Sequence, residues 1–271
     1  MTTETRPETH LTTHRGGFSP GVTKVLSLGD GRGVDIAFYM LNLPAGASQE
    51  VPPVFHQCAA IVLGGSGTIA VSPKRGEELP RTAVSRRDVF TEPPHSFLLP
   101  RGAGMSLTAG ETGLEIALCS VPGAGQPAPR EIPPAAVRCE ERGEGQLGGT
   151  YHRQVRTVAD GSNAKGWGFV FGEVVNQAGR WSSYPPHHHP QPEIYYYRFD
   201  KPQGYGHAEI GEQVVKVRGH DLTLMRAGQD HAQVSAPGYA MWYLWVIRNL
   251  KDQVYDTPEF TEEHQWLLSA K

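Results

Sequence analysis

The sequence predicts an all-β protein with two β-domains in tandem. The chain contains 32 Gly and 22 Pro among 271 residues, well above their combined average usage of about 12 %, so turns must be frequent. Short runs rich in β-branched and aromatic residues lie between these turns, and no long helical pattern interrupts them. A segment dense in Pro, Gly and charge divides the chain near its middle.

The predicted strands follow one another along both halves and are bounded by Gly, Pro, Asp or Asn. In the first half they are VDIAFYMLNL, AAIVLGG, GTIAVSP, HSFLLP and GLEIALCSV. In the second half they are GFVFGEVV, EIYYYRF, QVVKVR, DLTLMRAG and YAMWYLWVI. A short helix is expected only in PEFTEEHQWLL, residues 258–268.

The domain boundaries follow from the central segment. We expect a flexible segment over 1–20, a first domain over 21–121, a linker over 122–149 and a second domain over 150–271. Residues 98–110, LLPRGAGMSLTAG, align with 224–238, LMRAGQDHAQVSAPG, so the two domains resemble divergent copies. Met105 then falls where His231 stands, and the first domain is expected to lack a full metal site.

Composition excludes several classes of function. The net charge is −3, with acidic and basic residues interspersed, so neither a nucleic-acid footprint nor a polybasic membrane face is predicted. Three cysteines without CxxC spacing are typical of a reducing cytoplasm. The first twenty residues contain no apolar run typical of a signal peptide, and no segment reaches the length of a membrane span. A cytoplasmic protein with a small polar substrate is expected.

The stretch WSSYPPHHHPQPEIYYYRF, residues 181–199, predicts a metal site. His187 and His189 are two residues apart, so on an extended strand their imidazoles lie on one face. Glu193 follows a short PQP turn, and His231 lies in a turn that enters another strand. Three imidazoles and a carboxylate bind a divalent cation and leave positions open to substrate. The alternative interpretation is a polar loop with an adventitious histidine run.

The combination of motifs favours the metal site. An H-x-H pair, a glutamate after a short turn, a glycine eleven residues later and a downstream Gly-x-x-His resemble the two-part cupin signature. This resemblance implies a jelly-roll barrel in the second half. Because the halves resemble each other, it implies a bicupin of two jelly-roll β-barrels in tandem.

A narrower resemblance lies in WSSYPPHHHP, EIYYYR, PQGYG, the Gly-x-x-His turn and APGYAMWYLWV. These motifs resemble the 5-deoxyglucuronate isomerase family of myo-inositol catabolism and, more distantly, 5-keto-4-deoxyuronate isomerase. The resemblance implies conversion of the aldose 5-deoxy-D-glucuronate to the ketose 2-deoxy-5-keto-D-gluconate. It implies one divalent metal ion per chain, held by His187, His189, Glu193 and His231. Zinc is the expected metal, with Mn, Fe and Ni as alternatives.

The sequence departs from this family around the pocket. The family usually has a lysine where His188 stands and an acidic residue at Pro190, and its loop before the glutamate is longer. Candidates for the catalytic base are Glu193, His188 and a hydroxide held by the metal. These departures bear on substrate specificity more than on the metal ligands.

The alternation of side chains along the predicted strands indicates which residues could bind substrate. Tyr195 and Tyr197 share parity with Glu193 and should line the same interior, although core packing is the alternative for each. Tyr196 and Arg198 have the opposite parity and should face another layer or a subunit partner. The further candidates are Tyr184, Gln203 and Tyr243 for the sugar oxygens, and Arg180 or Arg226 for the substrate carboxylate.

Three functions remain open from the sequence. The first is the isomerase acting on a small uronic acid. The second is an iron-dependent cupin dioxygenase with the same ligands, and the third is a non-catalytic sugar-acid binder. In each case a homo-oligomer without nucleic-acid or membrane partners is expected.

Overall fold

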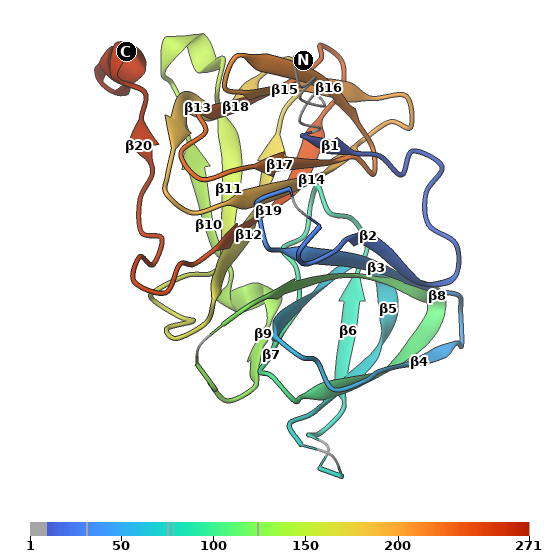
Figure 1. The fold of residues 1–271 in the computed structure, drawn as a ribbon. Coiled ribbons are helices and arrows are strands. Elements are labelled where there is room, and N and C mark those ends of the chain that lie inside the picture. The colour runs from blue at the N-terminus through green and yellow to red at the C-terminus, as the bar shows by residue number, and fades with distance from the viewer. Residues whose placement is uncertain (1–9, 31, 75, 78, 124, 271) are drawn as a thin grey trace, which may run out of the picture.

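The chain folds into two antiparallel β-barrels stacked one on the other (Figure 1). The computed structural model describes residues 10–30, 32–74, 76–77, 79–123 and 125–270. All strand pairs among these residues are antiparallel, as the sequence predicts for tandem barrels. No helix among them is long and apolar enough to cross a membrane.

The first barrel is a single sheet in the order β2-β3-β8-β5-β7-β9, with β4 on β8 and β6 on β5. Its strands are β2 (Gly21–Leu26), β3 (Ala37–Leu43), β4 (Ser48–Val51), β5 (Gln57–Ser72), β6 (Thr82–Arg86), β7 (Ser96–Leu99), β8 (Gly104–Val121) and β9 (Arg130–Ile132). The long strand β5 approaches β8 closely at Gly65, where φ is +87°. A Cβ atom at Gly65 would lie 2.2 Å from the carbonyl oxygen of Gly113, so this crossing requires glycine.

The second barrel has two sheets, ordered β1-β17-β14-β19-β12-β11-β10 and β16-β15-β18-β13-β20. The larger sheet contains β1 (Leu11–Thr12), β10 (Arg138–Arg142), β11 (Arg153–Ala159), β12 (Phe169–Asn176), β14 (Glu193–Phe199), β17 (Leu222–Met225) and β19 (Met241–Arg248). The smaller sheet contains β13 (Trp181–His188), β15 (Tyr205–Ile210), β16 (Gln213–Arg218), β18 (His231–Ser235) and β20 (Glu259–Phe260). The helices among the described residues are short and of the 3₁₀ type: η1 (Pro134–Ala136), η2 (Leu147–Gly149) and η3 (Glu262–Ser269). The last of these overlaps the helix expected over 258–268.

The segments predicted as connectors contain paired strands. Within 122–149, β9 pairs with β7 of the first barrel and β10 pairs with β11 of the second. Within 1–20, β1 pairs with β17 of the second barrel, and residues 1–9 lie outside the described residues. Edge strands of two to five residues have too little alternation to be recognised in a Pro- and Gly-rich sequence, which explains the difference.

Three apolar clusters form the core. One fills each barrel, and the third lies between the barrels and includes residues from both. Strand β14 contributes to two of them: Tyr195 and Tyr197 face into the second barrel, and Ile194 and Tyr196 face the first. The prediction that Tyr196 faces another layer is confirmed, because the centroid of its ring lies 5.2 Å from that of Phe38 on β3.

A buried ion cluster joins the two barrels. The guanidinium of Arg86, from β6, donates to both carboxylate oxygens of Glu173, from β12, at 2.8 and 2.7 Å. Arg156, from β11, lies 3.5 Å from the same carboxylate and donates to the carbonyls of Val89 and Phe90 in the first barrel. The side chains of the three charged residues are at most 2 % exposed. Each charge is therefore paired and hydrogen-bonded, as burial requires.

We expect Glu173→Ala to lower the free energy of unfolding by about 3–5 kcal/mol, because Arg86 and Arg156 would be left as unpaired buried cations. Chemical denaturation of the two proteins measures this difference. Arg87→Ala is the control: its side chain is 81 % exposed and pairs with Glu92 at 3.1 Å, so its loss should cost less than about 1 kcal/mol. Equal effects of the two substitutions would contradict a cluster that holds the barrels together.

Candidate functional site

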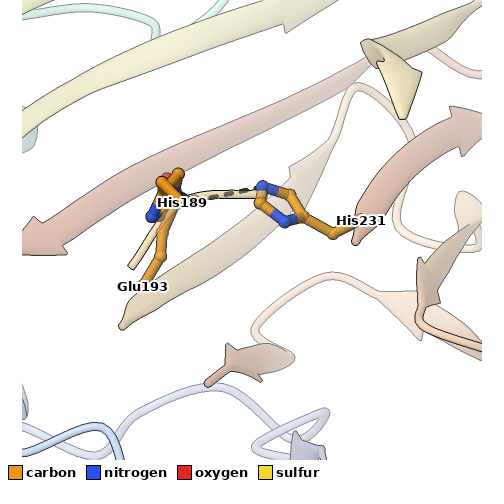
Figure 2. Close-up of side chains that lie close together, drawn as sticks. All are labelled: His189, Glu193 and His231. Atoms are coloured by element: carbon orange, nitrogen blue, oxygen red, sulfur yellow. Dashed lines mark hydrogen bonds and ion pairs between the residues drawn. The ribbon is translucent and has the colours of Figure 1, made fainter. Parts of the chain in front are cut away.

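Three of the four predicted metal ligands converge in the second barrel. His189 follows β13, Glu193 begins β14 and His231 begins β18. Their candidate ligand atoms all lie within 4.8 Å of one another (Figure 2). All three side chains are buried. The strands bring together residues that are 42 positions apart in the sequence, which the spacing of the motifs could only suggest.

The fourth predicted ligand, His187, lies beside this group. It is directly opposite His231 in the pairing of β13 with β18, and the two ring centroids are 4.5 Å apart. Burial, with a further contribution from the nearby His231, lowers the pKa of His187 to about 3. Its imidazole is therefore neutral at physiological pH, as a metal ligand must be.

Each of these imidazoles is anchored through Nδ1 to a backbone carbonyl two residues away. The pairs are His187 with Pro185 O at 3.2 Å, His189 with Gln191 O at 2.7 Å and His231 with Gln229 O at 3.0 Å. A carbonyl only accepts, so Nδ1 must carry the hydrogen in all three rings. In the neutral rings the lone pair is then on Nε2.

The Nε2 atoms point at a buried carboxylate. Those of His189 and His231 lie 3.1 and 3.2 Å from Oε2 of Glu193. Burial acts to raise the pKa of Glu193, but the contacts from His189 and His231 outweigh it and lower the pKa to about 2. The approach of His231 Nε2 lacks hydrogen-bond geometry, so this buried atom has no hydrogen-bond partner among the described residues.

This arrangement fits a divalent metal ion. At these distances an Nε2 lone pair of His189 or His231 and the carboxylate of Glu193 are compatible only if a proton or a cation lies between them. Histidine nitrogens with one carboxylate oxygen are ligands of Zn²⁺ and also suit Mn²⁺, Fe²⁺ and Ni²⁺. The Nδ1–H···O=C bonds hold the rings in the orientation that metal-ligating histidines usually have.

A cavity of about 370 Å³ opens beside the candidate ligands. Its walls include His187, His189 and Glu193, and its size is within the range of small-molecule sites, about 300–1,000 Å³. The C-terminal segment 255–260 forms one wall. This segment is attached through β20, which pairs with His187 and His188 of β13.

Hydroxyl groups from three strands meet at the cavity. Ser183 Oγ lies 3.0 Å from Tyr195 Oη and 3.1 Å from Tyr243 Oη, and Ser182 Oγ lies 2.5 Å from Tyr243 Oη. Burial raises the pKa values of Tyr195 and Tyr243. Both phenols are therefore protonated at neutral pH and can donate hydrogen bonds. Tyr184, the third predicted tyrosine of this wall, also lines the cavity.

Four predicted substrate-binding residues do not line the cavity. Tyr197 belongs to the core of the second barrel, with its hydroxyl 3.0 Å from Thr223 Oγ1 and 2.5 Å from Gln233 Oε1. Gln203 is exposed on the turn between β14 and β15. The two arginines bond elsewhere: Arg180 lies 3.1 Å from His152 Nδ1, and Arg226 donates to Arg32 O at 3.0 Å. These residues are close to the motifs in the sequence, and this closeness did not distinguish residues that line the cavity from residues that do not.

Neither predicted base residue is well placed to accept a proton. His188 lies outside the cavity wall, and its Nδ1 is 2.7 Å from Asp230 Oδ1. His187 and His189, the residues before and after it, lie at the ligand group, so alternation turns His188 the other way. Glu193 is in the cavity, but a carboxyl with a pKa of about 2 is a weak base. Glu193 is better suited to hold a cation.

Arg153 and Tyr255 are among the cavity residues that were not identified from the sequence. Arg153, on β11, lines the cavity and donates to the carbonyls of Tyr151 and Tyr184 at 3.0 and 3.1 Å. Arg153 is two residues before the inward-facing Val155 on the same strand, and this shared parity is the sequence signal that could have identified it. Tyr255, in the C-terminal segment, packs edge-on against His189 with ring centroids 5.0 Å apart, and no motif marks it.

Comparison with known proteins gives consistent relationships. The KduI/IolB family model matches residues 27–267. The chain is 28 % identical to the 5-deoxy-glucuronate isomerase of Shouchella clausii, covering 86 % of this chain and 88 % of that protein. It is also 28 % identical to the enzyme of the same name from Geobacillus thermodenitrificans, covering 87 % of each.

Solved structures share the fold. An IolB-like protein from Salmonella typhimurium LT2 superposes with a TM-score of 0.83 at 24 % identity, covering 96 % of this chain and 99 % of that one. The oxalate decarboxylase of Lactobacillus farciminis, in its formate complex, superposes with a TM-score of 0.69 at 13 % identity, covering 94 % and 88 %. The bicupin architecture predicted from the sequence is confirmed.

We expect His231→Ala to remove a bound divalent metal ion from the purified protein, because one of the converging donors is lost. Elemental analysis of protein prepared without chelators measures the metal content per chain. His188→Ala is the control and should keep its metal, since His188 faces Asp230 rather than the ligand group. Full metal content in the His231→Ala protein would contradict this site.

Proposed function

The chain belongs to the KduI/IolB family, it is an isomerase, and we propose that its reaction is the conversion of 5-deoxy-D-glucuronate to 2-deoxy-5-keto-D-gluconate. We further propose that the reaction depends on one divalent metal ion per chain, with zinc as the expected metal. The reaction would serve myo-inositol catabolism. The observation that supports this most strongly is the convergence of imidazole nitrogens and an ionised carboxylate beside a cavity large enough for a sugar acid.

The reaction moves a hydrogen between two adjacent carbons and changes no overall oxidation state. The aldehyde gains one hydrogen on its carbon and one on its oxygen and becomes a hydroxymethyl group, while the neighbouring CHOH group loses its C–H and O–H hydrogens and becomes a ketone. A divalent cation held by the histidines and Glu193 would polarise the substrate carbonyl and offset the negative charge that develops during the transfer.

The protein groups beside the candidate metal ligands would orient the substrate. His189, Glu193 and His231 are fixed by buried contacts, so they keep their geometry when substrate enters. Tyr195 is a protonated phenol beside this group, with its ring centroid 5.7 Å from that of His231. Its hydroxyl would donate to a substrate oxygen near the reacting carbons, and Ser183 would hold it in that position.

The proposal is tested by following the purified, metal-loaded enzyme with 5-deoxy-D-glucuronate by NMR in D₂O. We expect the ketose to form with deuterium at the former aldehyde carbon, because a proton transferred by the protein exchanges with solvent. The double variant His187→Ala/His189→Ala should lose turnover. Oxygen consumption would instead indicate a dioxygenase, and binding without turnover would indicate a sugar-acid binder.

The role of the cavity phenol is tested with two tyrosines of the same strand. We expect Tyr195→Phe to lower kcat/KM about tenfold, the effect of losing roughly one hydrogen bond to the reacting substrate. Tyr197→Phe removes an equally buried hydroxyl that contacts Thr223 and Gln233 instead of the cavity, so it should lower stability while kcat/KM is unchanged. If both variants lose activity equally, Tyr195 acts through packing.

A further inference from the structure

We propose that Arg153 binds the carboxylate of the substrate and thereby selects uronic acids over neutral sugars. The inference rests on the proposed function for the identity of the substrate. Arg180 and Arg226, the arginines that the sequence nominated for this task, do not line the cavity, whereas Arg153 does. A guanidinium is the side chain best suited to a carboxylate, because it can donate two parallel hydrogen bonds.

Arg153 differs from the other arginines of the cavity wall in its partners. Arg138 pairs with Asp160 at 2.8 Å, and Arg142 pairs with Glu140 at 2.8 Å. Arg153 donates only to the two backbone carbonyls described above, and no carboxylate among the described residues lies within ion-pair distance of it. A half-buried guanidinium without an anion is costly. A bound carboxylate would supply the missing countercharge.

A second positive charge on the neighbouring strand adds to the uncompensated charge of Arg153. Arg142 is the direct cross-strand partner of Arg153 in the pairing of β10 with β11. Like charges directly opposite each other destabilise a sheet. Together with burial, the charge of Arg142 lowers the pKa of Arg153. A carboxylate bound at Arg153 would reduce the repulsion between the two cations.

The position of Arg153 also suits the shape of the substrate. An open-chain uronic acid has its aldehyde at one end and its carboxylate at the other. In the larger sheet Glu193 lies across β19 from Val170, whereas Arg153 lies beside Asn176 at the other end of β12. The guanidinium nevertheless reaches the same cavity, where it donates to the carbonyl of Tyr184, next to Ser183.

The experiment compares 5-deoxy-D-glucuronate with 5-deoxy-D-glucose, which has a hydroxymethyl group in place of the carboxylate. In the metal-loaded enzyme, Arg153→Ala should raise KM for the uronate about 10- to 100-fold and leave kcat/KM for the neutral sugar unchanged. Arg153→Lys should recover part of the loss. Arg180→Ala is the matched control, and its KM for the uronate should equal that of the unmodified enzyme. Metal content and melting temperature are measured for every variant.

Two results would overturn the inference. One is an unchanged KM for the uronate in Arg153→Ala. The other is an equal loss of kcat/KM on both sugars, which would assign Arg153 to the shape of the wall instead of to the carboxylate.

A binding measurement separates this inference from the proposed function. Calorimetry with D-glucuronate and D-glucose as probes should show binding of the acid that is weakened in Arg153→Ala and retained in Arg180→Ala. If the unmodified enzyme fails to isomerise 5-deoxy-D-glucuronate but shows this pattern, the proposed function is wrong and the carboxylate site stands. If it isomerises the uronate and D-glucuronate binding is the same in both variants, the carboxylate site is wrong.

Discussion

The two-residue alternation of strand β14 is the constraint on which both the core and the site depend. The strand is central in its sheet, between β17 and β19, and both of its faces are buried. One face puts Glu193 and Tyr195 into the barrel, and the other puts Ile194 and Tyr196 into the core between the barrels. A shift of one residue would turn the carboxylate of Glu193 toward the inter-barrel core and put Ile194 or Pro192 in its place among the candidate ligands. The packing of the two barrels therefore fixes the register of β14 and with it the position of Glu193 among the candidate ligands.

The candidate metal centre shows how backbone geometry prepares a binding site. Three imidazoles are held by Nδ1 bonds to carbonyls two residues away, and the Nε2 atoms of His189 and His231 both lie beside the carboxylate of Glu193. Their lone pairs and the buried carboxylate oppose one another until a positive charge lies between them. Cation binding and stability of the second barrel are therefore linked, because a ligand that binds the folded state contributes its binding free energy to folding.

The sequence predicted the parts of this molecule that follow from periodicity and from compact motifs. The tandem barrels, the parity of Tyr196 and the convergence of His189, Glu193 and His231 all belong to this group. Other positions depend on which distant strands become neighbours. Tyr197 shares parity with Tyr195, yet it is two residues further along β14, where its hydroxyl contacts Thr223 and Gln233 instead of the cavity. Arg153 lies forty residues before Glu193 on a strand without a motif, so no local pattern could assign it to the cavity.

The pairing of β1 with β17 means that the barrels are interlocked and not merely consecutive. A fragment that starts at the helix η1 would include every candidate metal ligand and the whole cavity wall, but it would lack the strand that covers the edge of β17. It would also leave the apolar face around Tyr196 and Trp242 in water. An uncovered sheet edge beside an exposed apolar surface promotes self-association. The half of the chain that contains the site is thus poorly suited to separate expression, because the first barrel covers an apolar face of the second.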